Sequence, residues 1–286
     1  MKYGVVALIG RPNVGKSTLL NTLLGHKVSI TSPKPQTTRF NIQAVYEDDR
    51  GQIIFVDTPG IFARTPDTLS KRINARAEGA LTRGIDAVVY MVDHTRQRDT
   101  EENKALGIVR KFEGPKILVI NKIDIHTPTH IVQYKFLEDE FTTVIMLSAL
   151  AHKNTNILLE TLFDILPEGK PIVDRSTLAQ PALNMDSKLF LSEIIREKAF
   201  LFLRDEVPYT LASAVDEVIE RDNGTVYIKA KIITSADRYK AMIIGKNGAM
   251  IKEISQAARK ELETATEKKV YLELTVVTDP HWMEYV

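Results

Sequence analysis

Residues 10–17 leave few folds open to this chain, because they read Gly-Arg-Pro-Asn-Val-Gly-Lys-Ser. This is the pattern G-x-x-x-x-G-K-[ST], in which a glycine-rich loop cradles phosphate groups. The apolar run at residues 5–9 predicts a buried strand before the loop, and leucines that share one face predict a helix after it, ending at Gly25. A loop placed there exposes backbone N–H groups at the positive end of a helix dipole. The sequence therefore predicts a phosphate-binding site.

Two side chains of this loop carry the expected chemistry. Lys16 would reach the β- and γ-phosphates of a nucleotide, and the Ser17 hydroxyl would ligate Mg²⁺. The loop residues expected to contact the nucleotide are Gly10, Asn13, Val14, Gly15, Lys16, Ser17 and Thr18. The alternative is a glycine-containing turn that matches the pattern by chance, and the flanking strand and helix argue against it.

Composition fits a globular protein of two domains. The chain has 286 residues, 44% apolar and 26% charged, and ~100–200 residues per domain is usual. The net charge is only +1, so a nucleic-acid partner would be held by a local patch. There is no cysteine, and no apolar run approaches ~18 residues. We expect a cytoplasmic protein without a transmembrane segment; peripheral association with the inner membrane is left open.

Short apolar strands alternate with helix-like stretches in the first part of the chain. The expected strands are at residues 5–9, 40–46, 52–56, 87–92, 117–120 and 144–147, with a hairpin turn at 48–51. This alternation predicts an α/β fold, a mostly parallel sheet with helices on both faces. Because ligands bind at the carboxyl ends of such strands, we assign residues 1–168 to a nucleotide-binding domain.

A different pattern follows a predicted linker at residues 169–182. Residues 167–171 read Pro-Glu-Gly-Lys-Pro and break the last helix. Beyond the linker the expected order is α-β-β-α-α-β, with the strong hairpin signal Asn223-Gly224 between the first two strands. Residues 183–286 are therefore predicted to form an α+β domain.

The sequence Asp57-Thr58-Pro59-Gly60 follows the third strand. A carboxylate at Asp57 can hold Mg²⁺ through one of its waters, and the Gly60 N–H can approach a γ-phosphate with no side chain in the way. The same tetrapeptide is also good turn chemistry, and its place after the phosphate loop favours the magnesium interpretation.

The sequence Asn121-Lys122-Ile123-Asp124 indicates which base is bound. The Asp124 carboxylate can accept from guanine N1–H and from its exocyclic amine, two donors that adenine lacks. A site built around such bonds rejects an analogue without them by roughly 10⁴-fold. The other interpretation is a helix cap with solvated charges. After the last strand, Ser148, Ala149 and Leu150 are expected to add a backbone contact to the base edge.

These motifs resemble those of a translation-factor-related GTP-binding domain. The resemblance implies a first switch at Thr31–Arg39 and a second from Asp57 to about Thr68. It makes Thr38 a direct magnesium ligand beside Ser17, with Thr37 as the alternative, and Asp57 an outer ligand. Lys16, Asn13, Thr38 and Gly60 are then the catalytic residues.

This chain departs from Ras-like proteins at the residue that orients the attacking water. Ras-like proteins place a glutamine directly after the second-switch glycine to orient it, and this chain has Ile61. Backbone groups, or machinery supplied from outside, must then position the water, and intrinsic hydrolysis is expected to be slow. Asn13 resembles the asparagine of GTPases that use K⁺ beside the phosphates; its alternative role is that of a turn residue.

In the second domain, Ile244-Gly245-Lys246-Asn247-Gly248 resembles the G-x-x-G loop of a KH domain, which clamps single-stranded nucleic acid. Glycines let backbone approach phosphate closely, and Lys246 adds charge. Two helices joined by a tight turn are the alternative. The element order is that of the bacterial variety of the KH fold.

The pairing of these domains resembles the Era family of bacterial GTPases over nearly the whole chain. The resemblance implies GTP and GDP as ligands, binding to 16S ribosomal RNA near its 3′ end, and a role in assembly of the 30S subunit. We expect a monomer. Two other hypotheses remain: a signalling switch whose second domain binds a protein, and a phosphate-loop metabolic kinase, which would have no use for Asn121 to Asp124.

Overall fold

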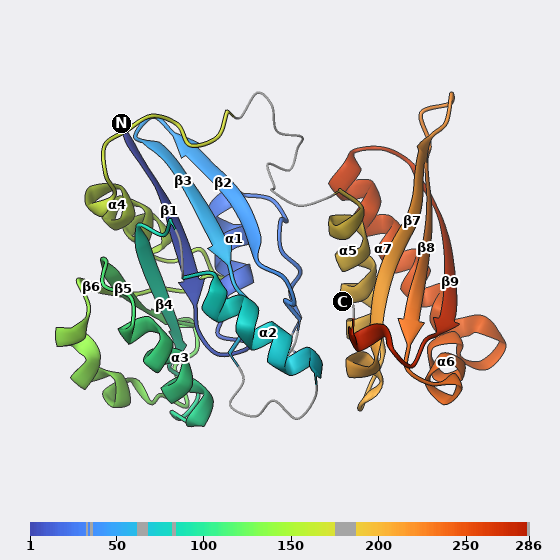
Figure 1. Cartoon of the computed structure of the whole chain (residues 1–286), viewed down its shortest axis with the longest axis horizontal. Helices are drawn as coiled ribbons and strands as arrows, with labels where there is room; N and C mark the ends of the chain where they lie inside the picture. Colours follow the sequence, from blue (N-terminus) through green and yellow to red (C-terminus); the bar gives the residue numbers. More distant parts are fainter. Residues whose placement is uncertain (33, 35–36, 62–67, 82–83, 175–186, 285–286) are drawn as a thin grey trace. The chain divides into compact units, whose positions relative to one another are not determined.

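The computed structural model describes residues 1–32, 34, 37–61, 68–81, 84–174 and 187–284. The chain divides into two compact units, Met1–Asn184 and Met185–Val286 (Figure 1). Residues 175–182 of the predicted linker lie outside the described residues, so the limits at 168 and 183 stay predictions. No helix in the described ranges is long and apolar enough to cross a membrane.

The first unit is built on a six-stranded sheet in the order β2-β3-β1-β4-β5-β6. The strands are β1 (Lys2–Ile9), β2 (Ile42–Asp48), β3 (Gly51–Asp57), β4 (Ala87–Asp93), β5 (Lys116–Asn121) and β6 (Thr143–Met146). All neighbours pair in parallel except β2 and β3, which form the predicted antiparallel hairpin. The predicted α/β class, with a mostly parallel sheet, is confirmed.

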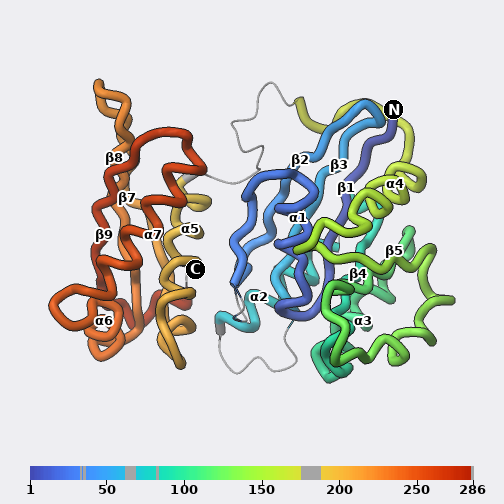
Figure 2. The backbone as a smooth tube through the Cα atoms, turned by 180° about the vertical axis from the view of Figure 1, so that it is seen from behind, coloured from blue at the N-terminus to red at the C-terminus, as the bar shows by residue number. Residues whose placement is uncertain are grey.

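Two apolar layers cover this sheet because successive strand residues point to opposite faces. Val6 and Leu8 pack with α1 (Lys16–Leu24) and α4 (Thr155–Ile165), while Ala7 and Ile9 pack with α3 (Thr100–Arg110) and the 3₁₀ segment η1 (Ile131–Glu140). Helix α2 (Thr68–Gly79) joins the second layer through Ala77. Figure 2 shows α1 and α4 from behind the view of Figure 1.

The phosphate loop takes its place from these elements. Strand β1 ends at Ile9 and α1 begins at Lys16, preceded by Gly15 with φ of 104°. Helix α1 ends at Gly25, whose φ of 72° is the left-handed conformation of a glycine stop. The predicted strand, loop, helix and stop are therefore all present.

The second unit has the predicted α-β-β-α-α-β order. Its elements are α5 (Ser187–Phe202), η3 (Val207–Thr210), β7 (Leu211–Glu220), β8 (Val226–Thr234), α6 (Asp237–Ile244), η4 (Lys246–Gly248), α7 (Ala249–Thr266), β9 (Val270–Thr278) and η5 (Trp282–Glu284). Strand β8 lies between an antiparallel β7 and a parallel β9. Ile228, Ala230 and Ile232 of β8 are buried, whereas Lys229 between them is exposed, so one face of the sheet carries the core.

Candidate functional site

The phosphate loop closes around the ammonium group of Lys16. The Nζ atom donates to the carbonyl oxygens of Gly10 at 3.0 Å and Arg11 at 3.1 Å, and the side chain is only 6% exposed. Burial lowers the pKa of Lys16 to about 8, although the charges of Asp57 and Glu102 act to raise it. A negatively charged ligand bound in this loop would therefore contact a lysine ammonium that burial has already desolvated.

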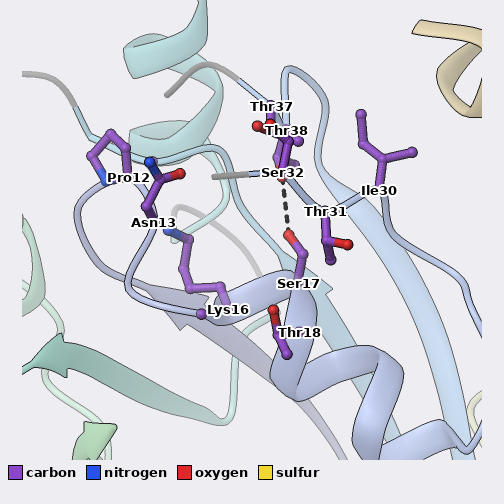
Figure 3. A pocket seen from close by; sticks show the side chains of 12 residues that line it. Pro12, Asn13, Lys16, Ser17, Thr18, Ile30, Thr31, Ser32, Thr37 and Thr38 are labelled. Carbon is purple, nitrogen blue, oxygen red and sulfur yellow. Dashed lines mark hydrogen bonds between the residues drawn. The ribbon is translucent and has the colours of Figure 1, made fainter. Parts of the chain in front are cut away.

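A cluster of oxygen atoms lies beside Lys16 at the predicted magnesium position. The Ser17 hydroxyl donates to Asp57 Oδ2 at 2.6 Å and lies 3.0 Å from Thr38 Oγ1; Figure 3 shows Ser17 pointing across the pocket to Thr38. Ser29 Oγ also donates to Asp57 Oδ2, at 2.7 Å, a contact that no sequence motif signals. The structure thus brings Ser17, Thr38 and Asp57 together, and places Thr37 elsewhere, with its hydroxyl on the Lys34 carbonyl at 2.6 Å.

The Asp57 carboxylate has room for one more partner. Its side chain is 0% exposed, and Oδ1 has no hydrogen-bond partner within the described residues. Burial raises the pKa of Asp57, while the charge of Lys16 and the bonds from Ser17 and Ser29 oppose the shift. Hard oxygen ligands around an unsatisfied buried carboxylate suit Mg²⁺ or a water bound to it.

One wall of the pocket is formed by Gly60, which packs so closely against the phosphate loop that a side chain would not fit. A Cβ at Gly60 would lie 2.7 Å from the N and Cα atoms of Pro12. The next residue, Ile61, donates its N–H to the Gly10 carbonyl at 3.4 Å and buries its side chain in the apolar layer of α3. The pocket between these walls is lined by Pro12, Asn13, Gly15, Lys16, Ser17, Thr18, Ile30, Thr31, Ser32, Thr37, Thr38 and Gly60.

Asn121 joins the phosphate half of the site to the predicted base half. Its Nδ2 donates to the Val14 carbonyl at 2.7 Å, and its Oδ1 accepts from Ala149 N at 3.0 Å. Thr22 on α1 donates to the Ala149 carbonyl at 2.8 Å. Asn121 is 2% exposed, and a Cβ at Gly15 would collide with its amide. These hydrogen bonds therefore hold the loops after β1, β5 and β6 together at the carboxyl edge of the sheet.

Two of the residues expected to meet the base, Asp124 and Leu150, lie open to solvent, whereas Ser148 and Ala149 are buried. Asp124 is exposed within a turn closed by the Ile125 N–H and the Lys122 carbonyl at 2.9 Å. Leu150 is 76% exposed, and Ser148 Oγ accepts from Ala151 N at 3.0 Å. The Asp124 carboxylate is thus available to a ligand. Of the predicted switches, residues 33, 35, 36 and 62–67 lie outside the described part of the chain.

A buried ion pair that sequence reasoning missed ties the phosphate loop to α3. Arg11 is 0% exposed; its Nε lies 3.0 Å from Glu102 Oε2, and its Nη1 donates to Asp99 Oδ2 at 2.9 Å. Glu102 also accepts from the Tyr90 hydroxyl. Because Arg11 occupies a variable position of the loop pattern, the motif gives no signal for this contact.

The glycine loop of the second unit is exposed. Helix α6 ends at Ile244 and is followed by Gly245, with φ of 72°, and α7 begins after Gly248, with φ of 76°. A Cβ at Gly245 would lie 2.9 Å from Met250 N, whereas one at Gly248 meets only Ile251 at 4.0 Å. Lys246 and Asn247 are exposed, while Ile244 is half-buried beside the fully buried Ile243. The loop offers backbone and one cation to solvent.

Two family models match the chain. One, described as a 50S ribosome-binding GTPase, matches residues 5–122, and the other, described as a KH domain, matches residues 206–281. GTPase Era of Trichlorobacter lovleyi is 42% identical over 99% of this chain and 94% of its own length. GTPase Era of Geotalea daltonii is 39% identical over 98% and 94%.

Two solved structures agree with these sequence matches. A variant of Aquifex aeolicus Era bound to GDP and AlF₄⁻ is 38% identical and has a TM-score of 0.91 over 100% of this chain and 96% of that chain. Era in complex with MgGDPNP and nucleotides 1506–1542 of 16S ribosomal RNA gives the same values.

The fold and the nucleotide site define a phosphate-loop GTPase joined to a KH domain. On the near full-length identity to its relatives, this chain belongs to the Era family of GTPases. It binds GTP and hydrolyses it to GDP and phosphate.

The lowered pKa of Lys16 predicts how nucleotide binding depends on pH. Between pH 7 and pH 9 the ammonium loses its proton in the nucleotide-free protein, and bound phosphates must restore it. Affinity for GDP should therefore fall as the pH rises through about 8, by up to roughly tenfold per pH unit above it. Calorimetric titration across this range measures the slope. A Lys16→Met variant should bind weakly with a flatter profile, and parallel profiles would contradict the assignment.

Proposed function

We propose that this GTPase is a switch that binds single-stranded 16S ribosomal RNA near its 3′ end and acts in assembly of the 30S subunit. The observation that carries the proposal is the match, at 38% identity over the whole chain, to an Era complex holding MgGDPNP and nucleotides 1506–1542 of 16S ribosomal RNA. The exposed Gly245–Gly248 loop supports it from this chain's own structure. We further propose that the protein works as a monomer.

The residues around the pocket divide the work of hydrolysis. Ser17 and Thr38 would hold Mg²⁺ directly and Asp57 through water, and the bound ion would neutralise charge on the β- and γ-phosphates. Lys16, already desolvated, holds the phosphates from the other side. The Gly60 N–H donates to the γ-phosphate, because no side chain separates its backbone from the pocket. These groups stabilise charge that develops during transfer.

The attacking water has no side chain to orient it at position 61. Ile61 is 0% exposed and packs in the α3 layer, and it is not among the residues that line the pocket. We propose that intrinsic hydrolysis is slow and that K⁺ beside Asn13 supplies positive charge. Asn13 lines the pocket with φ of 64°, which turns the loop at this point.

Base selection is proposed to rest on Asp124. The prediction is that Asp124→Asn changes the preference from guanine to xanthine, since an amide donates to the xanthine O2 where the carboxylate accepted from the guanine amine. Competition of GDP and xanthosine diphosphate for the protein measures the change. Indifference of the variant to the base would remove Asp124 from the site.

The potassium proposal predicts faster GTP hydrolysis in KCl than in NaCl at equal ionic strength. The reason is that no arginine is predicted to act as a finger from within this chain, so the cation offsets phosphate charge. Asn13→Ala should lose the difference between the salts and keep the slow sodium rate. The rate of phosphate release, measured in both salts, tests this prediction. Equal rates of GTP hydrolysis by the wild type in KCl and NaCl would contradict the proposal.

The RNA proposal predicts a charge effect at Gly248, where the structure has space for a side chain. Asparagine and aspartate both tolerate its left-handed backbone and have nearly the same size, but only aspartate adds a negative charge. Gly248→Asp should therefore weaken binding of a single-stranded 16S 3′-end fragment much more than Gly248→Asn does. Lys246→Ala should flatten the log–log salt dependence by up to ~1.

GDP affinity serves as the control for both Gly248 variants and should equal that of the wild type. If the aspartate and asparagine variants bind RNA equally well, phosphate does not approach this loop, and a protein partner for the second unit becomes the better hypothesis.

A further inference from the structure

The proposed base-recognition turn depends on an unusual backbone conformation. Lys122 has φ of 69°, in the left-handed region that non-glycine residues adopt at a cost. This conformation directs the chain from Asn121, which faces the phosphate loop, into the turn that carries Asp124. Such a residue keeps its conformation only when its surroundings hold it.

Asp93, the last residue of β4, and His94, the next residue, both hold Lys122. Strands β4 and β5 pair with Asp93 opposite Asn121, so the loops after them run side by side. The Lys122 ammonium donates to the buried Asp93 Oδ2 at 2.7 Å. Its main-chain carbonyl lies 3.0 Å from His94 Nε2. Asp93 thus binds the side chain of Lys122, and His94 binds its main-chain carbonyl.

The hydrogen bonds of His94 define its role. A carbonyl oxygen only accepts, so Nε2 carries a proton and donates to Lys122; Nδ1 then lies 3.1 Å from the Thr129 hydroxyl. The ring is buried, with 5% of the residue exposed. Its own carbonyl accepts from His130 N at 2.7 Å, which ties the segment beyond the turn to β4.

The same Lys122 oxygen receives a second bond, from Ile125 N at 2.9 Å, which closes the turn around Asp124. His94 therefore anchors the atom that closes the turn. Without His94 this oxygen keeps the local bond but loses its attachment to β4, so the turn and the Asp124 carboxylate are free to shift together.

We propose that His94 is a positioning residue for base recognition, acting on Asp124 through the Lys122 carbonyl. The inference rests on the proposed role of Asp124 in reading guanine. Within the described residues, the hydrogen bonds of His94 go to Lys122, Thr129 and His130, none of which belongs to the phosphate loop or the predicted magnesium site. Its effect is therefore expected in the base half of the site.

The test compares His94→Leu, which removes the donor, with His94→Gln, whose amide N–H reaches as far as Nε2. His126→Leu, at an exposed histidine in the loop that carries Asp124, is the control. The measurement is the affinity of each protein for GDP and for inosine diphosphate, whose base lacks the exocyclic amine that Asp124 accepts from.

For His94→Leu, GDP affinity should fall roughly tenfold, the equivalent of one hydrogen bond to a buried acceptor. The affinity for inosine diphosphate should fall less, so the ratio of the two affinities, which favours GDP, should decrease. The turnover rate at saturating GTP should stay within about twofold of the wild type, because the phosphate half is untouched. His94→Gln should restore the preference, and His126→Leu should keep it.

The outcomes separate the two proposals. A wild-type protein that binds the two nucleotides equally would remove Asp124 from base recognition, and the inference with it. If the wild type prefers GDP and His94→Leu keeps the same ratio, only the role of His94 is overturned. An equal loss for both nucleotides with a lower melting temperature would show a general structural role and would also overturn it.

Discussion

The nucleotide site depends on the burial of two opposite charges at the carboxyl edge of one sheet. Lys16 is nearly inaccessible to solvent and Asp57 is fully inaccessible. Desolvation lowers the pKa of Lys16 and raises the pKa of Asp57, which favours the neutral form of each side chain. Loop carbonyls take the lysine ammonium, and two serine hydroxyls take one carboxylate oxygen. The other carboxylate oxygen has no hydrogen-bond partner within the described residues, and we propose that bound Mg²⁺ and phosphate complete the bonding of the two groups. Burial without full compensation is costly, so the protein is built to be completed by its ligand.

Much of this arrangement could be predicted from the sequence, because motifs and periodicity act locally. The phosphate loop, the stop at Gly25, the hairpin before β3 and the α-β-β-α-α-β order all follow from residues close together in the chain. The contacts that refine the site join distant residues. Ser29 with Asp57 and His94 with Lys122 are each 28 positions apart, and their pairing depends on how strands align. For Ile61 the sequence excluded a water-orienting amide, but only the packed fold shows that its side chain is buried in the α3 layer.

Both units place a glycine with positive φ between a loop and a helix. Gly15 directly precedes α1 and Gly248 directly precedes α7, so the positive end of each helix dipole faces the loop before it. The lysines differ: Lys16 is buried and held by carbonyl groups, whereas Lys246 is exposed. The first loop is therefore suited to one well-defined phosphate chain, and the second to a backbone held by salt-sensitive attraction.

The central claim is that the two loops belong to one switch, in which GTP and RNA favour the same state of the protein. Such coupling is reciprocal and typically amounts to ~1–3 kcal/mol. The direct measurement is a titration of one labelled single-stranded 16S 3′-end fragment against the protein saturated with a non-hydrolysable GTP analogue and against the GDP form. The account predicts that RNA binds at least about 5-fold more tightly to the GTP-analogue form. Identical affinities would show two unconnected binding modules and would contradict it.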